Sequence, residues 1–342
     1  YLKKATGKPA TGKQSNINGQ IYLFNGEGQM QHGWVAATSS DEKFVQLDKE
    51  DEEQKMSAAG EADVYYCGDE DDGHAKKNKW VKTWLPSDTN EEEDDKEWFW
   101  FDKEGKVFRA SETKKNSVET AANAEKYKLD EGTLTPDDGK VATLIGKKKV
   151  NSKDYWFRND GVMLSKFYKI NDAMFYFGGA DDGSMKTGSQ SIKDNAGDTY
   201  KFYFYTKDQT TDKYQTPKYG KKLKKGAGVV GNQSNKLYYY GLLLTADDYK
   251  YQVVTLKDND GQDVKFIINS NGSIQHSYGT TYKEDGQDLI VVDEVLGKEY
   301  KDSEGKKQTG TAKYVEDGQY KYGFKSGVEN KVSDVDLTKF YN

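Results

Sequence analysis

Tryptophan is the residue type in this chain whose spacing most suggests binding chemistry, and two of the six tryptophans lie in the segment Trp98-Phe99-Trp100-Phe101. Residues i and i+2 of a β-strand project from one face, about 6.6–6.8 Å apart, so a strand here places Trp98 and Trp100 on one side and both phenylalanines on the other. An exposed pair of indoles at this separation suits stacking against successive sugar rings, whose C–H faces are apolar. The alternative is that all four rings pack between neighbouring elements, because aromatic side chains are mostly structural.

Other aromatic residues extend the set of candidate ligand contacts. Trp80 and Trp84 are predicted to share a strand face, and Trp156 lies in a later strand. The candidate ligand-binding residues are Trp34, Trp80, Trp84, Trp98, Trp100, Trp156, Tyr155, Tyr238 and Tyr240. Taken singly, each of these rings belongs more often to a core than to a site.

Sugar recognition also needs polar side chains around an aromatic floor. Asp102, Lys103, Asn159 and Asp160 lie in predicted turns next to the tryptophan-bearing strands. These four residues are therefore candidates for bonding sugar hydroxyls. The simpler interpretation is that they form turns and face water, since Asp and Asn are typical turn residues.

The strands that carry these residues belong to repeated segments. Aromatic clusters begin near Tyr22, Tyr65, Trp98, Tyr155, Phe175, Phe202, Tyr238, Phe266, Tyr300 and Tyr320. Their spacing of roughly 20 to 55 residues is typical of repeat architectures. Aromatic residues beside a short Asp/Asn/Gly turn predict a β-hairpin, and a hairpin of this size must stack on its neighbours to bury its rings. The sequence therefore predicts a mainly β fold, with tandem β-hairpin repeats forming an elongated solenoid or ribbon.

The predicted turns share one chemistry, because Asn and Asp tolerate a positive φ and Gly accepts it freely. They include Asn159-Asp160-Gly161, Asp181-Asp182-Gly183 and Asn269-Ser270-Asn271-Gly272. A fourth, in the segment 258–263, places carboxylates at alternate positions around a glycine, as calcium loops do. It lacks the distal glutamate of such loops and a hairpin turn explains it, so no metal site is predicted.

The hairpin pattern lapses between Ser111 and Pro136. Residues 117–126 are the one helix-like stretch, with Ser117 as a candidate N-cap, and predict a short helical insertion near 117–128. The expected organisation is hairpin repeats over 1–110, an insertion over 111–140 and further hairpin repeats over 141–342, with one continuous array as the alternative.

Composition narrows the class of partner. Of the 342 residues, 34% are hydrophobic, 32% charged and 13% aromatic, and disordered segments lack so many aromatics. The net charge of −6 comes from 51 basic and 57 acidic residues mixed along the chain, which argues against a nucleic-acid partner. No apolar run approaches the ~18 residues of a membrane span, so no membrane insertion is expected. Because the chain starts with Tyr1, we expect a fragment of a longer mature protein.

Catalysis finds little support in the sequence. His32, His74 and His276 are the only histidines, and none lies beside a nucleophile motif. The single cysteine, Cys67, excludes an internal disulfide framework, and no phosphate-binding loop is present. A glycosidase needs two carboxylates flanking a cleft, and nothing marks such a pair. The prediction is a non-catalytic protein without a cofactor.

One motif carries a family resemblance. Gly28-Gln29-Met30-Gln31-His32-Gly33-Trp34 matches the pattern Gly-x-Met-x-x-Gly-Trp, and residues 183–188 match all of it but the last tryptophan. Gly161-Val162-Met163 and Gly272-Ser273-Ile274 keep its start. These segments resemble the cell-wall-binding repeats of Gram-positive surface proteins, a family that includes choline-binding repeats and the glucan-binding repeats of glucansucrases. The resemblance covers most of residues 15–335.

The resemblance implies a β-hairpin array whose grooves hold aromatic cages or platforms. Only Trp34 keeps the Gly-Trp pair, with Trp80 in the comparable place of the next repeat, so a glycan platform is favoured over a regular ladder of choline cages. We therefore predict a secreted or cell-surface protein that binds a glucan-type polysaccharide, such as starch. The alternatives are a cell-wall anchor recognising teichoic acid choline or peptidoglycan, and a structural spacer or adhesin whose aromatic residues are all core.

Overall fold

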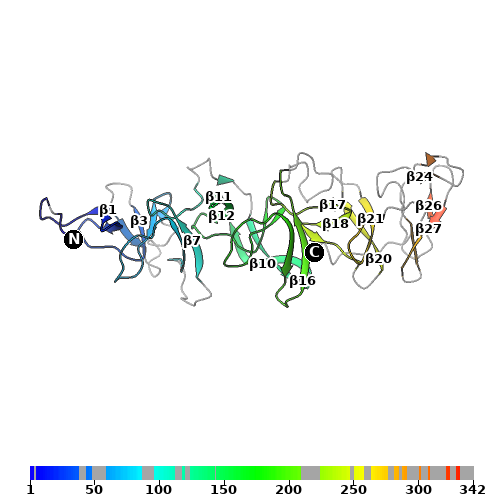
Figure 1. Ribbon diagram of the computed structural model, residues 1–342, viewed down its shortest axis with the longest axis horizontal. Helices are drawn as coiled ribbons and strands as arrows, with labels where there is room; N and C mark the ends of the chain where they lie inside the picture. Colours follow the sequence, from blue (N-terminus) through cyan, green and yellow to red (C-terminus); the bar gives the residue numbers. More distant parts are fainter. Residues whose placement is uncertain are drawn as a thin grey trace. The chain divides into compact units, whose positions relative to one another are not determined.

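The computed structural model describes 1–3, 5–37, 44–47, 59–86, 96–111, 118–119, 124–142, 144–208, 224–246, 250–257 and 263–275, and short strands between 281 and 331 (Figure 1). The chain divides into two compact units. The first unit comprises Tyr1–Glu125, Lys140–Lys166 and Phe177–Met185. The second unit comprises Lys126–Gly139, Phe167–Tyr176 and Lys186–Asn342.

Every named element in the described ranges is a β-strand, which confirms the mainly β prediction. In the first unit the sheets are small and antiparallel. They are β1 (Gly12–Ile17) with β2 (Gln20–Phe24); β3 (Trp34–Ala37) between β4 (Phe44–Leu47) and β5 (Val64–Tyr66); β6 (Lys79–Thr83) with β7 (Glu97–Phe101); and β11 (Ile145–Val150) between β8 (Val118–Glu119) and β12 (Lys153–Arg158).

The second unit continues the same architecture of short hairpins. One sheet has the order β10-β9-β13-β14, with strands Thr133–Ala142, Ala124–Asp130, Phe167–Ile170 and Ala173–Tyr176. The next has the order β15-β16-β19-β18-β17, with strands Gly188–Lys193, Thr199–Phe204, Leu242–Leu243, Lys236–Tyr239 and Gly231–Gln233. Separate hairpins follow: β20 (Tyr251–Lys257) with β21 (Asp263–Asn269), β22 (Thr281–Glu284) with β23 (Gln287–Ile290), β24 (Tyr300–Lys301) with β25 (Lys307–Gln308), and β26 (Lys321–Gly323) with β27 (Glu329–Lys331).

The short helix predicted near 117–128 is wrong where the structure describes this stretch. Residues 118–119 form β8 and residues 124–130 form β9. β9 pairs on both sides, and Tyr127 and Leu129 pack into an apolar cluster with Phe167 and Phe202. An isolated helix of this length is marginal in water, so sheet pairing and burial override the local propensity. No described helix is long enough to cross a membrane.

One turn recurs after strands β2, β7 and β21. In each turn the backbone N–H of an Asn or Asp donates to the carbonyl of the residue four positions later. The N–H of a glycine three positions later donates to the carbonyl of the same Asn or Asp. The pairs are Asn25 with Gly28, Asp102 with Gly105, and Asn269 with Gly272. The Asn or Asp side chain also accepts two backbone N–H groups of its own turn. The glycines have φ between 72° and 83°, a region that β-carbon sterics disfavour. The tandem hairpins predicted from these turn residues are confirmed.

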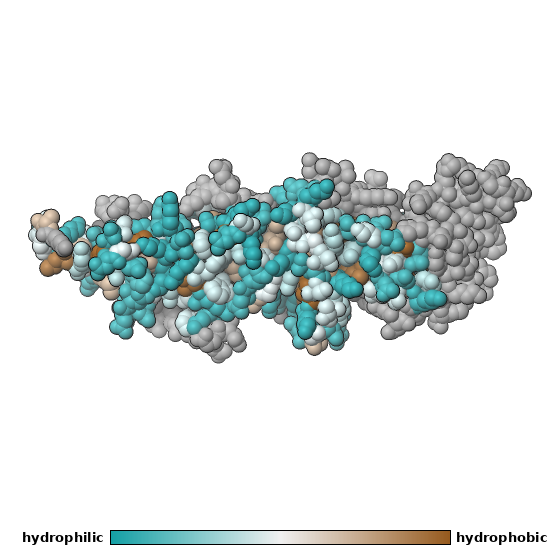
Figure 2. All heavy atoms as spheres, in the orientation of Figure 1, coloured by the Kyte–Doolittle hydropathy of each residue, from teal (hydrophilic) through white to brown (hydrophobic). Residues whose placement is uncertain are grey.

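Hydrophobic side chains are largely internal. Phe99 and Phe101 are fully buried with Trp34 and Val64 in one cluster of the first unit. On the face shown in Figure 2, most described atoms belong to hydrophilic residues, and the hydrophobic ones form small separate spots. Partly exposed aromatic rings are therefore the features of interest for binding.

Candidate functional site

The β6–β7 hairpin sorts its rings onto two faces. Trp80 lies opposite Trp100, and Lys82 lies opposite Trp98. Strand alternation places these four side chains on one face and Phe99 and Phe101 on the other. Both phenylalanines are 0% exposed, whereas Trp80, Trp98 and Trp100 keep part of their surface in solvent. The predicted alternation of this strand is confirmed.

The three indoles rest on rings of the next hairpin. The ring centroid of Trp80 lies 5.2 Å from that of Trp100, 4.8 Å from that of Tyr155 and 5.8 Å from that of Phe157. Tyr155 and Phe157 belong to β12 and are buried beneath the indoles. We call Trp80, Trp98 and Trp100 the indole platform. Its rings are held from below and partly open above.

A carboxylate and an ammonium group lie at the edge of the indole platform. Asp181 Oδ1 accepts a hydrogen bond from Trp98 Nε1 at 2.8 Å and another from Lys82 Nζ at 2.8 Å. These two bonds, first that from Lys82, lower the pKa of the Asp181 carboxyl. Because the Asp181 side chain is 66% exposed, its second oxygen is within reach of a ligand hydroxyl. The platform therefore combines apolar ring faces with a fixed hydrogen-bond acceptor.

The loop that carries Asp181 is shaped by glycines. Gly178 has φ +73° and Gly183 has φ +66°. A β-carbon at Gly178 would meet the Asp182 carboxylate, and one at Gly183 would meet the Met163 thioether. Ser184 also forms an isolated bridge with Tyr155. The packing of Gly183 on Met163 and the bridge from Ser184 to β12 hold the loop in place, which keeps Asp181 beside Trp98.

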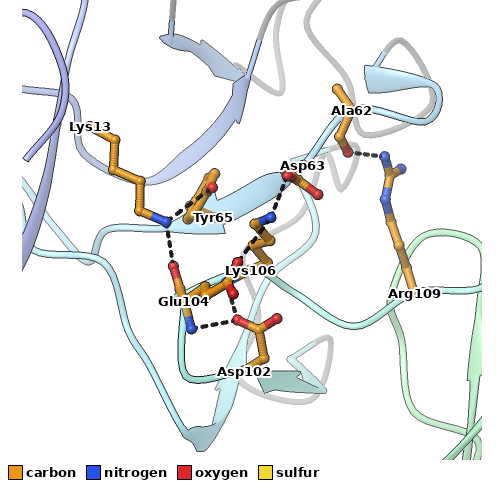
Figure 3. Close-up of polar contacts among 8 residues, drawn as sticks. All are labelled: Lys13, Ala62, Asp63, Tyr65, Asp102, Glu104, Lys106 and Arg109. Carbon is orange, nitrogen blue, oxygen red and sulfur yellow. Dashed lines mark hydrogen bonds and ion pairs between the residues drawn. The ribbon is translucent and has the colours of Figure 1, made fainter. Parts of the chain in front are cut away.

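A polar network fixes the turn at the end of β7 (Figure 3). Asp102 accepts the N–H groups of Glu104 and Lys106 at 2.8 and 2.9 Å. Lys106 Nζ pairs with Asp63 at 2.8 Å and with Glu104 at 3.1 Å. Lys13 Nζ donates to the Glu104 carbonyl at 2.8 Å. Asp102, a candidate for bonding sugar, is thus engaged in its own turn.

The same network shifts the pKa of its members. The hydrogen bond to Asp63 is the main cause that raises the pKa of Lys106, and burial lowers the pKa of Lys13. Burial raises the pKa of Tyr65 to about 12. The Tyr65 hydroxyl lies 3.4 Å from Lys13 Nζ, and Figure 3 shows both beside the β7 turn. The network is consistent with a structural role, since it joins three segments of the chain around the β7 turn.

The other predicted candidates lie apart from the indole platform. Trp34 is 5% exposed, with its Nε1 donating to the Trp84 carbonyl at 2.7 Å, and Trp156 is 3% exposed. Trp84 follows β6 and has Lys96 Nζ 4.2 Å above its ring. Tyr238 (buried) and Tyr240 (partly buried) belong to the second unit, where burial raises the pKa of each hydroxyl. Of the candidates, the structure brings together Trp80, Trp98, Trp100 and Tyr155.

Asp181 and Lys82 were not among the candidates. The segment Asp181-Asp182-Gly183 is a turn by its sequence, and Asp181 lies 83 residues from Trp98 along the chain. Lys82 shares the alternation of β6 with Trp80, so its place on the platform face follows from the strand register. The position of Asp181 depends on tertiary packing, for which the sequence carries no local signal.

In the described ranges no three His, Cys, Asp or Glu side chains are grouped to hold a metal ion, and residues 258–262 fall outside those ranges. Cys67 is buried, and burial raises the pKa of its thiol to about 12. A thiol at that pKa is not a nucleophile at neutral pH.

No protein-family model and no curated protein match the chain. Several solved structures match it. Choline-binding protein F from Streptococcus pneumoniae, in the presence of a peptidoglycan analogue, is 19% identical over 90% of this chain and 89% of that one, with a TM-score of 0.27. The autolysin LytC from the same organism, in complex with synthetic peptidoglycan ligand, is 13% identical over 91% and 51%, with a TM-score of 0.31. Alternansucrase in complex with isomaltononaose is 15% identical over 94% and 18%, with a TM-score of 0.21.

The chain is thus similar to solved choline-binding proteins over most of its length, as its motifs indicate.

Proposed function

We propose that this chain is a non-catalytic carbohydrate-binding region of a secreted or cell-surface protein, and that the indole platform is its binding site. The observation that carries the proposal is three partly exposed indoles on one face of the β6–β7 hairpin, with the Asp181 acceptor at their edge. Aromatic faces stack on the apolar faces of sugars, and a few placed polar groups fix orientation.

The ring contacts argue against a cation cage at these indoles. A cation held by two rings needs to approach each centroid within about 6 Å from the open face of the ring. Trp80 is in direct contact with both Trp100 and Tyr155, at centroid separations of 5.2 and 4.8 Å. A trimethylammonium group does not fit between rings that already touch. A pyranose stacked on the open face of one indole requires no such gap.

We propose a glucan-type polysaccharide, such as starch or a related α-glucan, as the ligand. Support comes from alternansucrase, whose matching structure contains isomaltononaose. A cell-wall glycan or choline is the second candidate, because matching structures contain peptidoglycan analogues and the Asp181 carboxylate next to Trp98 suits a cationic group.

Affinity electrophoresis tests the proposal. The purified chain should be retarded in gels containing starch or dextran, and oligosaccharides should change its tryptophan fluorescence. Trp98→Ala and Trp100→Ala should each weaken binding by roughly tenfold, as loss of one stacking contact worth about 1–2 kcal/mol implies. The matched control is Trp84→Ala, which removes a partly exposed indole outside the platform and should leave binding unchanged.

Two results would overturn this assignment. Absence of retardation and of any fluorescence change would remove the carbohydrate proposal. Binding to washed cell walls that free choline displaces, without binding to glucans, would transfer the site to the second candidate.

A further inference from the structure

The edge of the indole platform opposite its hydrogen-bonded carboxylate carries a cationic side chain, Lys148. Lys148 lies in β11, directly opposite Tyr155 of β12, so its side chain shares the face of β11–β12 that supports the indoles. Its Nζ lies 4.8 Å from the ring centroid of Phe108. Phe108 donates its backbone N–H to the Trp100 carbonyl at 2.8 Å, which places Phe108 beside Trp100. Lys148 is therefore next to the platform.

Lys148 differs from its neighbours in β11. Lys147 Nζ lies 3.6 Å and Lys149 Nζ 3.9 Å from the Asp154 carboxylate. Strand alternation directs these two lysines to the face opposite that of Lys148. In the described part of the chain the Lys148 ammonium has no carboxylate within ion-pair distance, and its contact is the Phe108 ring.

A half-buried lysine whose ammonium has no carboxylate partner is an available anion site. A charge-assisted hydrogen bond from an ammonium to a phosphate or carboxylate is about twice as strong as a neutral one. At the other edge, the Lys82 ammonium is already bound to Asp181. One edge of the platform therefore offers a ligand the Asp181 carboxylate, and the other offers the Lys148 ammonium.

We propose that the indole platform prefers a polysaccharide carrying an acidic group, a phosphate ester or a uronic acid carboxylate, and that Lys148 binds this group. The inference rests on the proposed function, because the acidic group reaches Lys148 only when sugar rings lie on the indoles. At the opposite edge the Asp181 carboxylate faces the hydroxyls of the sugar and sets the direction in which the polysaccharide lies on the indoles.

The test compares neutral and acidic oligosaccharides by tryptophan fluorescence titration at low and high salt. The probes are maltohexaose, a phosphorylated malto-oligosaccharide and an oligogalacturonate of similar length. The wild-type chain should bind at least one acidic probe roughly tenfold more tightly than maltohexaose at low salt, and this preference should shrink at high salt. The two acidic probes distinguish phosphate from carboxylate as the preferred group.

Variants locate the effect at one side chain. Lys148→Met keeps an unbranched stem over Phe108 and should abolish the preference while leaving maltohexaose binding unchanged. Lys148→Arg should retain the preference. Lys149→Met, with the same change of charge on the opposite strand face, is the matched control and should keep the preference.

The outcomes separate the two proposals. If maltohexaose binds and neither acidic probe binds more tightly, the role of Lys148 is wrong and the carbohydrate site stands. A preference that survives Lys148→Met also overturns the role of Lys148. If no probe binds the wild-type chain, the proposed function itself fails, and this inference fails with it.

Discussion

Strands β7 and β12 carry the same pattern of rings and present it differently to solvent. Trp100 and Trp156 each lie one residue before a buried phenylalanine, Phe101 or Phe157, that precedes a turn. Trp100 is partly exposed, whereas Trp156 is 3% exposed and lies 6.5 Å from the Phe177 ring. Sequence position within the repeat therefore does not decide exposure.

The difference follows from how many rings each face must cover. The β6–β7 hairpin presents three indoles, and the next hairpin covers them with Tyr155 and Phe157. On the other face of β12 a single indole, Trp156, lies between Asp154 and Arg158 and is buried, with Phe177 packed against it. The platform has more indoles than the neighbouring side chains can cover, so part of the indole surface stays open to solvent.

The largest expected effect comes from the buried face of β7. Phe101→Ala should lower the free energy of unfolding by about 3–5 kcal/mol, because it removes a fully buried ring and leaves a cavity. Trp100→Ala, on the partly exposed face, should cost less than about 2 kcal/mol. Urea denaturation followed by circular dichroism measures both. Equal losses of unfolding free energy in the two variants would mean that both faces of β7 are equally buried, which would contradict the contrast between them.

Alkaline pH should act on the network beside the β7 turn. The pKa of Tyr65 is raised to about 12 in the folded chain, against about 10 when unfolded, so folding favours the protonated hydroxyl. The stability from this group is fully present below pH 10 and is lost as pH rises through 12, a change of roughly 3 kcal/mol. Denaturant unfolding at pH 9 to 12 measures it. Tyr65→Phe should show a smaller loss over this range, and an identical loss would contradict the assignment.

A glycine substitution tests whether the loop that carries Asp181 positions this residue beside Trp98 of β7. Gly183→Ala should destabilise the chain by about 1–2 kcal/mol, because an L-residue at φ +66° is strained and the new β-carbon meets Met163. It should also alter the fluorescence of Trp98 by moving Asp181. The matched control is Gly179→Ala, in the same loop, where a β-carbon has no atom within 4 Å. Similar behaviour of the two variants would mean that loop shape does not position Asp181.

The smallest effect is expected at the exposed carboxylate. Asp181→Asn should leave the denaturation midpoint almost unchanged, since the pair with Lys82 is solvent-exposed. Oligosaccharide affinity should fall several-fold, because an amide is a weaker acceptor than a carboxylate. Fluorescence titration of the variant checks this. Unchanged affinity would limit the site to stacking alone.

The sequence predicted the parts of the site that depend on local geometry. Alternation in Trp98-Phe99-Trp100-Phe101 is a property of any strand, and the turns after β2, β7 and β21 depend on one Asn or Asp and one Gly. The burial of Trp156 and the approach of Asp181 to Trp98 depend on which hairpin packs where. The predicted helix near 117–128 is wrong for the same reason, since pairing of β9 outweighs local preference.

The recurring turn has a consequence for how the chain acquires its structure. Each copy closes through bonds among five consecutive residues, so it needs no partner elsewhere to form. Contacts of short sequence separation cost little loop entropy and favour rapid folding. We therefore expect folding to nucleate at several of these reversals independently and to spread from hairpin to hairpin, in the manner of a one-dimensional chain of coupled elements.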